Sequence, residues 1–223
     1  MLILLAIPTT LFIGIVYIDQ KQYYLTAFAV LIECMLPFFM IFEGRRPKAR
    51  ELVIIAVLCA LSIAGRAAFF MLPQFKPVLA MTIITGVAFG GETGFLVGAV
   101  TMLVSNIMFS QGPWTPWQMF AMGIIGFLAG VLYRKGLLSR TKTSLCVFGV
   151  LCAVLIYGGI MNPASALIWG GETLNIKMIM SYYLTGFPMD CIHAAATAIF
   201  LWFIADPMLE KLDRIKVKYG LVE

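Results

Sequence analysis

Four ionisable side chains lie within long apolar stretches of the sequence, where burying a charge is costly and therefore indicates a function. These four are Glu33, Arg66, Asp190 and His193. Asp190 and His193 are three residues apart, so on a helix they lie on one face. Asn106 and Gln118 are neutral polar residues that border apolar stretches. The pattern predicts a polar ligand site within an otherwise apolar protein.

These residues also have a simpler, structural explanation. Arg66 could pair with Asp190 or Glu33 only to neutralise its charge, because an unpaired charge is expensive within a membrane. A single helical histidine such as His193 is more often a hydrogen-bonded structural residue than a ligand. The sequence alone leaves the structural and the ligand-binding interpretation open.

Catalytic motifs are absent from the sequence. It contains no G-x-x-x-x-G-K-[ST], no H-E-x-x-H and no G-x-S-x-G. No nucleophile accompanies Asp190 and His193, because the adjacent Cys191 points in another direction on a helix. We therefore expect no catalytic residue, no metal and no cofactor. A stand-alone secondary carrier or an intramembrane enzyme that uses Asp190 and His193 is the alternative.

The composition excludes most soluble classes. Hydrophobic residues make up 61% of the 223-residue chain and charged residues 12%, against roughly 45–50% and about 25% in soluble domains. The net charge of +5 comes from basic residues in a few short loops, which is typical of membrane orientation rather than of a nucleic-acid partner. The five cysteines lie in apolar stretches without a C-x-x-C pair, which argues against a zinc site or a disulfide framework.

The apolar stretches predict an all-α integral membrane protein with about eight spans, since a span needs about 20 apolar residues. The fourth and fifth spans are short and form a hairpin hinged at Gly90-Gly91-Glu92-Thr93-Gly94. Short spans need shielding by neighbouring helices. The expected spans are residues 1–18, 23–42, 51–72, 77–90, 94–110, 117–133, 143–162 and 178–205.

Positive charge is distributed unevenly between the two sides. Loops 43–51 and 133–142 and the C-terminal tail hold twelve Lys and Arg residues, and the opposite loops hold three. Because positively charged loops stay in the cytoplasm, we expect a multi-pass protein of the cell membrane with both termini inside. The polar residues within the spans then lie in the outer half and the middle of the bundle.

Three tryptophans, Trp114, Trp117 and Trp169, lie near the expected outer boundary. They could form an aromatic belt at the membrane interface. They could instead belong to lids over an outward-facing pocket, which the stiff, Pro-rich loops around residues 72–77 and 111–118 favour. In the second interpretation they lie at the entrance of a site formed by Arg66, Asn106, Gln118, Asp190 and His193.

A stripe of small residues runs along the span of residues 51–72. Ala56, Ala60 and Ala64 repeat every four residues, and small residues allow helices in lipid to approach closely. The stripe could pack within the chain, or it could form the docking surface for another membrane protein.

From Ala49 to its end, the chain resembles the substrate-binding S components of energy-coupling factor (ECF) vitamin transporters. The resemblance rests on Ala56-x-x-x-Ala60, Phe75-Lys76-Pro77, the Gly-rich short hairpin and Gly112-Pro113-Trp114-Thr115-Pro116-Trp117-Gln118. It implies a six-helix vitamin binder that captures its ligand from outside. It also implies partners, namely a transmembrane coupling protein that docks on the Ala-x-x-x-Ala face and two cytoplasmic ATPases that hydrolyse ATP.

The same resemblance divides the chain into three parts. Residues 1–42 form an N-terminal transmembrane hairpin that the six-span pattern lacks, residues 49–205 form the substrate-binding core, and residues 206–223 form a basic cytoplasmic tail. The loop from Gly112 to Gln118 is most similar to that of S components assigned to cobalamin. The resemblance therefore implies a subunit for ATP-driven vitamin uptake, with a cobalamin-like ligand favoured.

The charge asymmetry makes a testable prediction about orientation. In intact cells, a cysteine introduced at Gln111 should react with a membrane-impermeant thiol reagent added outside, and a cysteine at Ser139 should not, because the basic loop that contains Ser139 stays inside. Labelling is compared with the parent protein, in which the native cysteines lie in apolar stretches. The reverse labelling pattern would reject this orientation.

Overall fold

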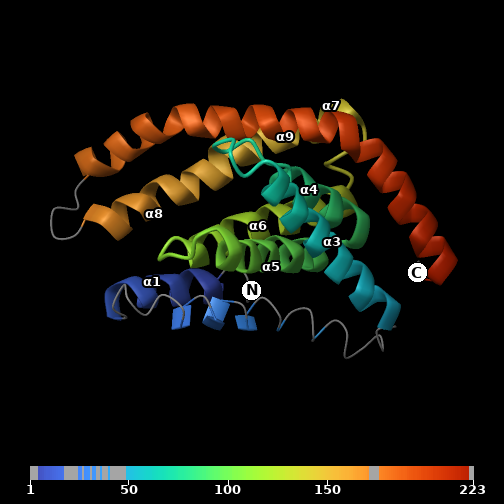
Figure 1. The fold of residues 1–223 in the computed structure, drawn as a ribbon, viewed down its shortest axis with the longest axis horizontal. Coiled ribbons are helices and arrows are strands. Elements are labelled where there is room, and N and C mark those ends of the chain that lie inside the picture. Colours follow the sequence, from blue (N-terminus) through green and yellow to red (C-terminus); the bar gives the residue numbers. More distant parts are fainter. Residues whose placement is uncertain are drawn as a thin grey trace.

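The computed structural model describes residues 5–17, 25–26, 28–30, 32–33, 36, 40, 49–170 and 176–220. Regular structure in these residues is helical throughout (Figure 1). The elements are α1 (Ile7–Tyr17), α3 (Ala49–Ala68), α4 (Val78–Phe89), α5 (Gly91–Phe109), α6 (Thr115–Arg134), α7 (Lys142–Leu151), the π-helical segment η3 (Cys152–Gly158), α8 (Gly159–Gly170) and α9 (Ile176–Tyr219). The expected all-α class is confirmed.

Five helical stretches among the described residues are long and apolar enough to cross a membrane, namely α3, α5, α6, the stretch Lys142–Trp169 and α9. The shorter α4 is apolar as well. These six correspond to the six expected core spans. The expected total of eight is not confirmed, because much of the N-terminal hairpin, including most of residues 23–42, lies outside the described residues.

Several expected boundaries differ from the structure. Residues 163–170 follow the expected span of residues 143–162 and were expected to lie in an outer loop, but they continue the helix as α8. The last helix extends beyond residue 205 through Pro207 to Tyr219. The five-residue hinge reduces to Gly90, whose φ of 92° and ψ of 170° suit only glycine. Helix α5 begins at the next residue, so two helices meet with one residue between them.

Helix α4 lies at the centre of the bundle, against α5, α6 and α9 (Figure 1). All of its twelve residues except Phe89 are buried. At 1.5 Å per residue it is about 18 Å long, too short to span the hydrocarbon core in contact with lipid. Its neighbours shield it, as expected for the short hairpin.

Glycines allow α4, α5 and α6 to approach at backbone distance. A Cβ atom on Gly94 of α5 would lie 2.5 Å from the carbonyl oxygen of Gly126 of α6, and a Cβ on Gly126 would in turn meet the backbone of Gly94. A Cβ on Gly86 of α4 would also meet the Gly126 carbonyl. Such contacts drive helix association in lipid, where burial of apolar surface does not.

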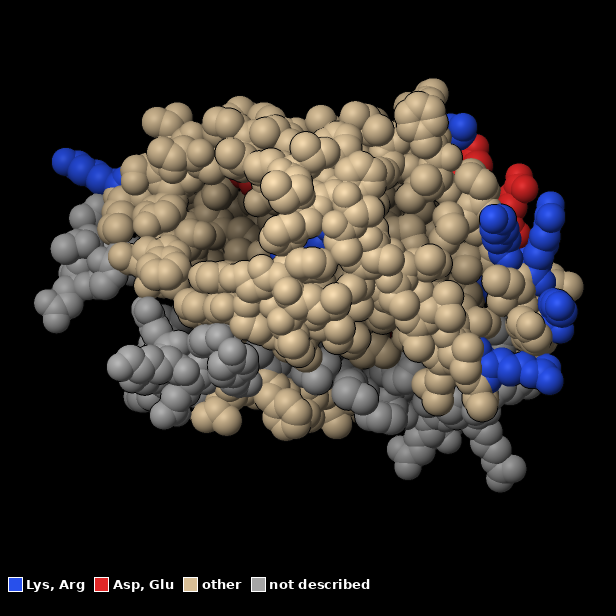
Figure 2. Space-filling model, viewed as in Figure 1, with Lys and Arg blue, Asp and Glu red and all other residues tan. Residues whose placement is uncertain are grey.

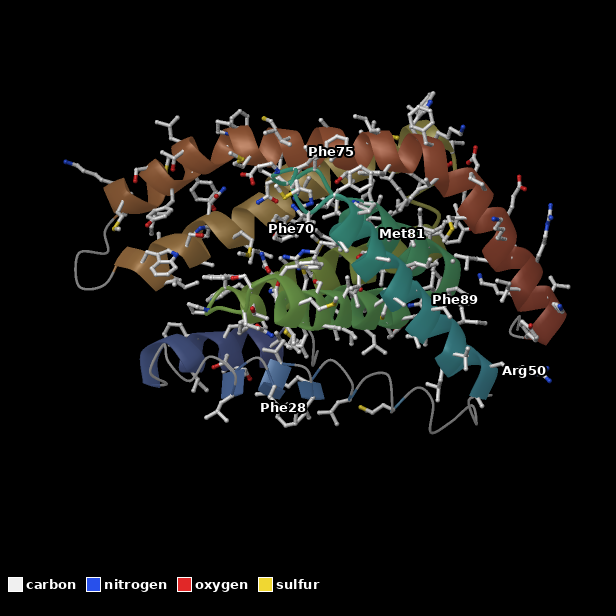
Figure 3. All side chains as sticks on the ribbon, in the orientation of Figure 1. Phe28, Arg50, Phe70, Phe75, Met81 and Phe89 are labelled. Atoms are coloured by element: carbon white, nitrogen blue, oxygen red, sulfur yellow. The ribbon has the colours of Figure 1, made fainter. Side chains whose placement is uncertain are left out.

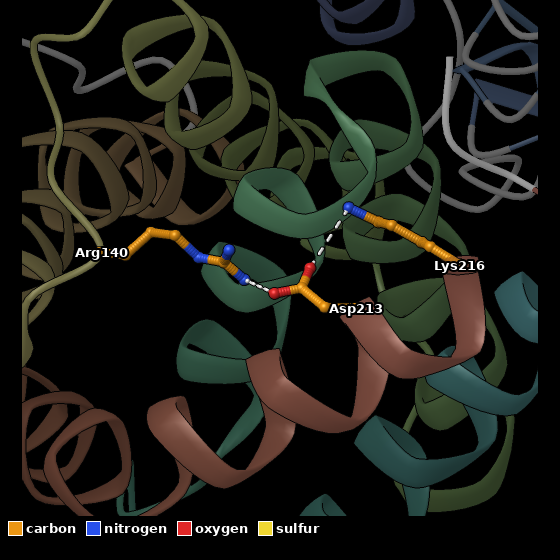
Figure 4. Close-up of polar contacts among 3 residues, drawn as sticks. All are labelled: Arg140, Asp213 and Lys216. Carbon is orange, nitrogen blue, oxygen red and sulfur yellow. Dashed lines mark hydrogen bonds and ion pairs between the residues drawn. The ribbon is translucent and has the colours of Figure 1, made fainter. Parts of the chain in front are cut away.

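Charged residues gather at one end of the molecule (Figure 2). There Arg140 donates to Asp213 at 2.7 Å and Lys216 lies 3.8 Å from the other carboxylate oxygen of Asp213 (Figure 4). Lys142 lies 3.4 Å from Asp206. The pairs of Arg140 and Lys142 connect the loop before α7 and the first residue of α7 to the C-terminal part of α9, and the pair of Lys216 lies within α9. Because they are partly exposed, each contributes only about 0–1 kcal/mol.

The glycine contacts predict that a single methyl group at the α5–α6 crossing is destabilising. We expect Gly126→Ala to cost about 1–3 kcal/mol through overpacking and to lower the unfolding temperature of the purified protein in detergent. Gly159→Ala is the matched control, because a Cβ there meets no atom within 4 Å. Equal unfolding temperatures for the two variants would contradict the close crossing.

Candidate ligand-binding site

A cavity of about 90 Å³ lies where six helical elements and one loop meet. Its walls combine hydrogen-bond donors with the thioether side chains of two methionines. The lining residues are Arg66, Gln74, Lys76, Val78, Met102, Gln118, Met122, Tyr157 and His193. We call this space the central cavity.

Arg66 lies in the last turn of α3. The helix ends at Ala68, two residues after Arg66, whereas the expected span of residues 51–72 would end six residues after it. The guanidinium group of Arg66 donates to the side chains of Ser105 and Asn106 on α5, the latter at 2.7 Å. In the described part of the chain it forms no ion pair with Asp190 or Glu33, so the expected neutralising pair is not observed. Glu33 accepts a hydrogen bond from Thr10 instead.

Asn106 connects Arg66 to the next helix. Its side chain is fully buried, and its amide nitrogen donates to Thr115 at 3.0 Å and to Gln118 at 2.8 Å, both on α6. The amide of Gln118 reaches the Tyr157 hydroxyl at 3.4 Å. A chain of hydrogen bonds therefore runs from α3 through α5 and α6 to η3 along the cavity wall.

The loop between α3 and α4 brings a second cation to this wall. Phe69 and Phe75 anchor the loop by packing on Phe200 of α9, with ring centroids 5.1 and 5.4 Å away, and Phe75 lies beneath α9 (Figure 3). Lys76 donates to the Leu72 carbonyl at 2.9 Å. Burial lowers the pKa of Lys76 below its usual value, and the nearby Arg66 lowers it further.

His193 and Tyr157 close the cavity on the α9 side. Their rings meet edge to face, with centroids 4.7 Å apart. His193 is only 4% exposed, yet its Nδ1 atom has no hydrogen-bond partner among the described residues. Leaving a buried polar atom unsatisfied costs about 1–3 kcal/mol. A ligand group in the cavity would recover that cost.

Tyr157 reaches the cavity from a π-helical segment. Its span follows regular α-helical geometry up to Leu151 and resumes it at Gly159, and Cys152–Gly158 lies between. Such segments occur frequently at functional sites. Because Tyr157 is the one tyrosine within residues 143–162, its place in an apolar span is a signal that sequence reasoning missed.

Asp190 lies apart from the other predicted site residues. Its carboxylate accepts a hydrogen bond from Asn162 of α8 at 2.8 Å. It borders an open groove of about 530 Å³ between η3, α8 and α9, which we call the α8–α9 groove and in which Leu155, Met180, Leu184 and Phe187 are more than half exposed. The other lining residues are Val154, Leu155, Gly159, Met180, Tyr183, Leu184 and Phe187. Asp190 and His193 share a helix face as expected but line different cavities.

The three tryptophans do not line the central cavity. Trp114, at the start of α6, and Trp169, near the end of α8, have ring centroids 6.4 Å apart, and Trp169 is 60% exposed. Trp117 packs against the apolar core. The predicted role of these residues at the entrance stays a prediction.

The structure therefore brings together four of the predicted residues: Arg66 and His193 with the wall residues Asn106 and Gln118. Sequence reasoning did not select Gln74, Lys76, Met102 or Tyr157 as ligand-binding residues. Lys76 carried a usable signal, as a cation enclosed between an aromatic residue and a proline. Among the described residues, no group of three His, Cys, Asp or Glu side chains could hold a metal ion.

The alanine stripe lies on the opposite side of α3 from the core. Ala56, Ala60 and Ala64 are all exposed, and Val53 and Val57 beside them are 60% and 50% exposed. The stripe is therefore open along α3, not packed within the described part of the chain.

Comparisons with known proteins agree with this architecture. Residues 47–210 match the family described as ECF-type riboflavin transporter, S component. A UPF0397 protein of Vibrio atlanticus is 27% identical over 126 residues, covering 53% of this chain and 69% of the relative. UPF0397 proteins of Aliivibrio fischeri and Aliivibrio salmonicida are 32% identical over 89 residues, covering 38% of this chain and 48% of each relative.

The chain thus spans about half the length of the two Aliivibrio relatives. No solved structure matches it significantly. The family match covers all six core helices, from α3 to most of α9, and with them the central cavity. The chain belongs to the family of ECF-type riboflavin transporter S components, the membrane-embedded substrate-binding subunits of ECF transporters.

Proposed function

We propose that this S component binds a riboflavin-class vitamin at the central cavity and delivers it for ATP-driven uptake. The observation that carries the proposal is the donor-rich wall: Arg66, Lys76 and Gln118 line the cavity together, and the buried Nδ1 of His193 lacks a partner. A ligand rich in carbonyl and hydroxyl oxygens complements such a wall, and riboflavin is a ligand of this kind. The family description names the same vitamin.

The size of the cavity favours riboflavin over cobalamin. Ligand pockets usually have volumes of roughly 300–1,000 Å³, and the central cavity has about 90 Å³. It has to enlarge for any vitamin, and far more for a corrinoid than for a flavin. The cobalamin-like ligand expected from the loop Gly112–Gln118 is therefore our second candidate.

The proposal includes orientation and partners. The polar groups open to the outside in the orientation that the loop charges favour, so the vitamin is captured there. ATP hydrolysis belongs to two cytoplasmic ATPases, joined through a transmembrane coupling protein. The exposed face of α3 with Ala56, Ala60 and Ala64 supports docking of that protein, because small side chains allow a partner helix to approach closely.

The alternative of a stand-alone carrier or intramembrane enzyme finds little support in the geometry. It depended on Asp190 and His193 acting together. These residues line separate cavities, and Asp190 is hydrogen-bonded to Asn162 rather than to His193.

The first prediction from this proposal concerns Arg66. Replacing it in Arg66→Gln removes a charged donor from the cavity wall, and losing a buried polar partner costs about 1–3 kcal/mol, or roughly 5- to 150-fold in affinity. Titration of riboflavin into the purified protein, followed by flavin fluorescence, measures the dissociation constant. Arg134→Gln, at an exposed arginine at the end of α6, is the matched control and should bind as the parent does.

Two results would count against the vitamin assignment. Equal riboflavin affinity in Arg66→Gln and Arg134→Gln would remove the central cavity from the binding site. Saturable binding of cobalamin to the parent protein, without binding of riboflavin, would replace the first candidate by the second.

The second prediction concerns the docking face. Ala60→Trp should retain riboflavin binding but lose copurification with the coupling protein and vitamin uptake, because the indole holds a partner helix away; overpacking costs typically about 1–3 kcal/mol. Ala195→Trp adds the same bulk at an exposed position of α9 and should leave riboflavin binding, copurification and vitamin uptake unchanged. Loss of riboflavin binding together with copurification in Ala60→Trp would indicate that the stripe packs within the subunit instead.

A further inference from the structure

The central cavity is too small for the vitamin that the proposed function assigns to it, and a larger space lies beside it. The α8–α9 groove has about 530 Å³, within the range of roughly 300–1,000 Å³ that ligand pockets occupy. This inference rests on the proposed function, because it concerns the same ligand.

The two cavities are lined by neighbouring residues of the same two helical stretches. On the helix that contains η3, Tyr157 lines the central cavity and Gly159, two residues later, lines the groove. On α9, His193 lines the central cavity and Asp190, about one turn earlier, lines the groove. The edge-to-face rings of Tyr157 and His193 therefore lie on the central-cavity side of the boundary between the two spaces, and we call this ring pair the Tyr157–His193 partition.

The cavities have opposite polarity. The central cavity offers Arg66 and Lys76, and no carboxylate of the described residues lines it. The groove offers the Asp190 carboxylate within an otherwise apolar and aromatic wall, to which the described part of the chain contributes no basic residue. On the face drawn in Figure 2, acidic atoms lie inside a hollow of uncharged surface, far from the charged end of the molecule. One space is therefore suited to hydrogen-bond acceptors and the other to an apolar group that carries a donor.

The helix crossings leave room for the polar pair at the groove. A Cβ atom on Gly158 would lie 2.5 Å from a carboxylate oxygen of Asp190, and a Cβ on Gly186 would meet the Asn162 side chain. Glycine on each helix thus makes space for the polar side chain of the other. Asp190 accepts one hydrogen bond in the described structure, from Asn162, and a carboxylate has room for several.

We propose that the central cavity and the α8–α9 groove are two compartments of one site for a planar heteroaromatic ligand with a hydroxylated side chain. The ring system lies in the groove against Tyr183, Leu184 and Phe187, with a ring N–H donating to Asp190. The side chain passes the Tyr157–His193 partition, and its oxygens accept from Arg66 and Lys76. The larger space is apolar and the smaller one polar, which fixes this direction rather than the reverse.

Two riboflavin analogues test the two ends of the ligand separately. N3-methylriboflavin lacks the ring N–H, and lumiflavin lacks the hydroxylated chain. In the parent protein we expect each change to weaken binding by about tenfold, as for a lost hydrogen bond to a charged group. In Asp190→Ala, riboflavin and N3-methylriboflavin should bind within about twofold of each other, while the penalty for lumiflavin persists. In Arg66→Gln the penalty for lumiflavin should shrink, while that for N3-methylation persists.

Asp206→Ala is the matched control on α9, since Asp206 lies outside both cavities and pairs with Lys142; it should show both penalties in full. Because each comparison is made within one variant, a general loss of affinity or stability does not imitate the expected pattern. Equal binding of riboflavin and N3-methylriboflavin by the parent protein would overturn the role of Asp190.

A third variant tests the groove without touching a polar group. A Cβ atom on Gly159 meets nothing within 4 Å, so the side chain of Gly159→Leu extends into open space in the groove. We expect riboflavin affinity to fall more than tenfold in Gly159→Leu while the unfolding temperature is maintained. Unchanged affinity would confine the ligand to the central cavity and overturn this inference alone. Absence of riboflavin binding in the parent protein would overturn the proposed ligand itself.

Discussion

The backbone contact between α5 and α6 is the constraint on which the rest of the molecule depends. Gly94 and Gly126 bring the two helices together more closely than any side chain allows. This contact fixes the register of the helices, and at their other ends the register places Asn106 opposite Thr115 and Gln118. Arg66 is in turn positioned by Asn106. The geometry of the cavity wall thus follows from glycines that lie several turns away from it.

Arg66 shows how the bundle accommodates a cation without a carboxylate. Its hydrogen-bond acceptors are neutral, namely the side chains of Ser105 and Asn106. Neutral acceptors satisfy the donors of a guanidinium group but leave its charge uncompensated. Lys76 on the same wall adds a second positive charge. The positive charges on this wall therefore favour a ligand with electron-rich oxygens. Such oxygens would offset the free-energy cost of leaving these charges uncompensated in the folded protein.

The helices could be predicted from the sequence because in lipid the length of an apolar run determines whether it spans. Their ends were harder to predict, since Pro207 does not end α9, and the π-helical turn before Gly159 has no recognisable pattern. Arg66 and His193 were found because an ionisable residue in an apolar stretch is conspicuous. Asp190 was assigned to the same pocket because it is ionisable, lies in an apolar span and shares a helix face with His193, but these signals do not reveal that it borders the α8–α9 groove instead.

Helix α3 contributes both to the exposed alanine stripe and to the wall of the central cavity. Its exposed face presents Ala56, Ala60 and Ala64, and its last turn places Arg66 in the cavity wall. A helix is stiff over 20 residues, so a shift of one end displaces the face along its length. Among the described residues, Arg66 is joined to α5 by side-chain hydrogen bonds to Ser105 and Asn106. The cavity wall at this point therefore joins α3 to a pair of helices, α5 and α6, whose backbones already lie in close contact.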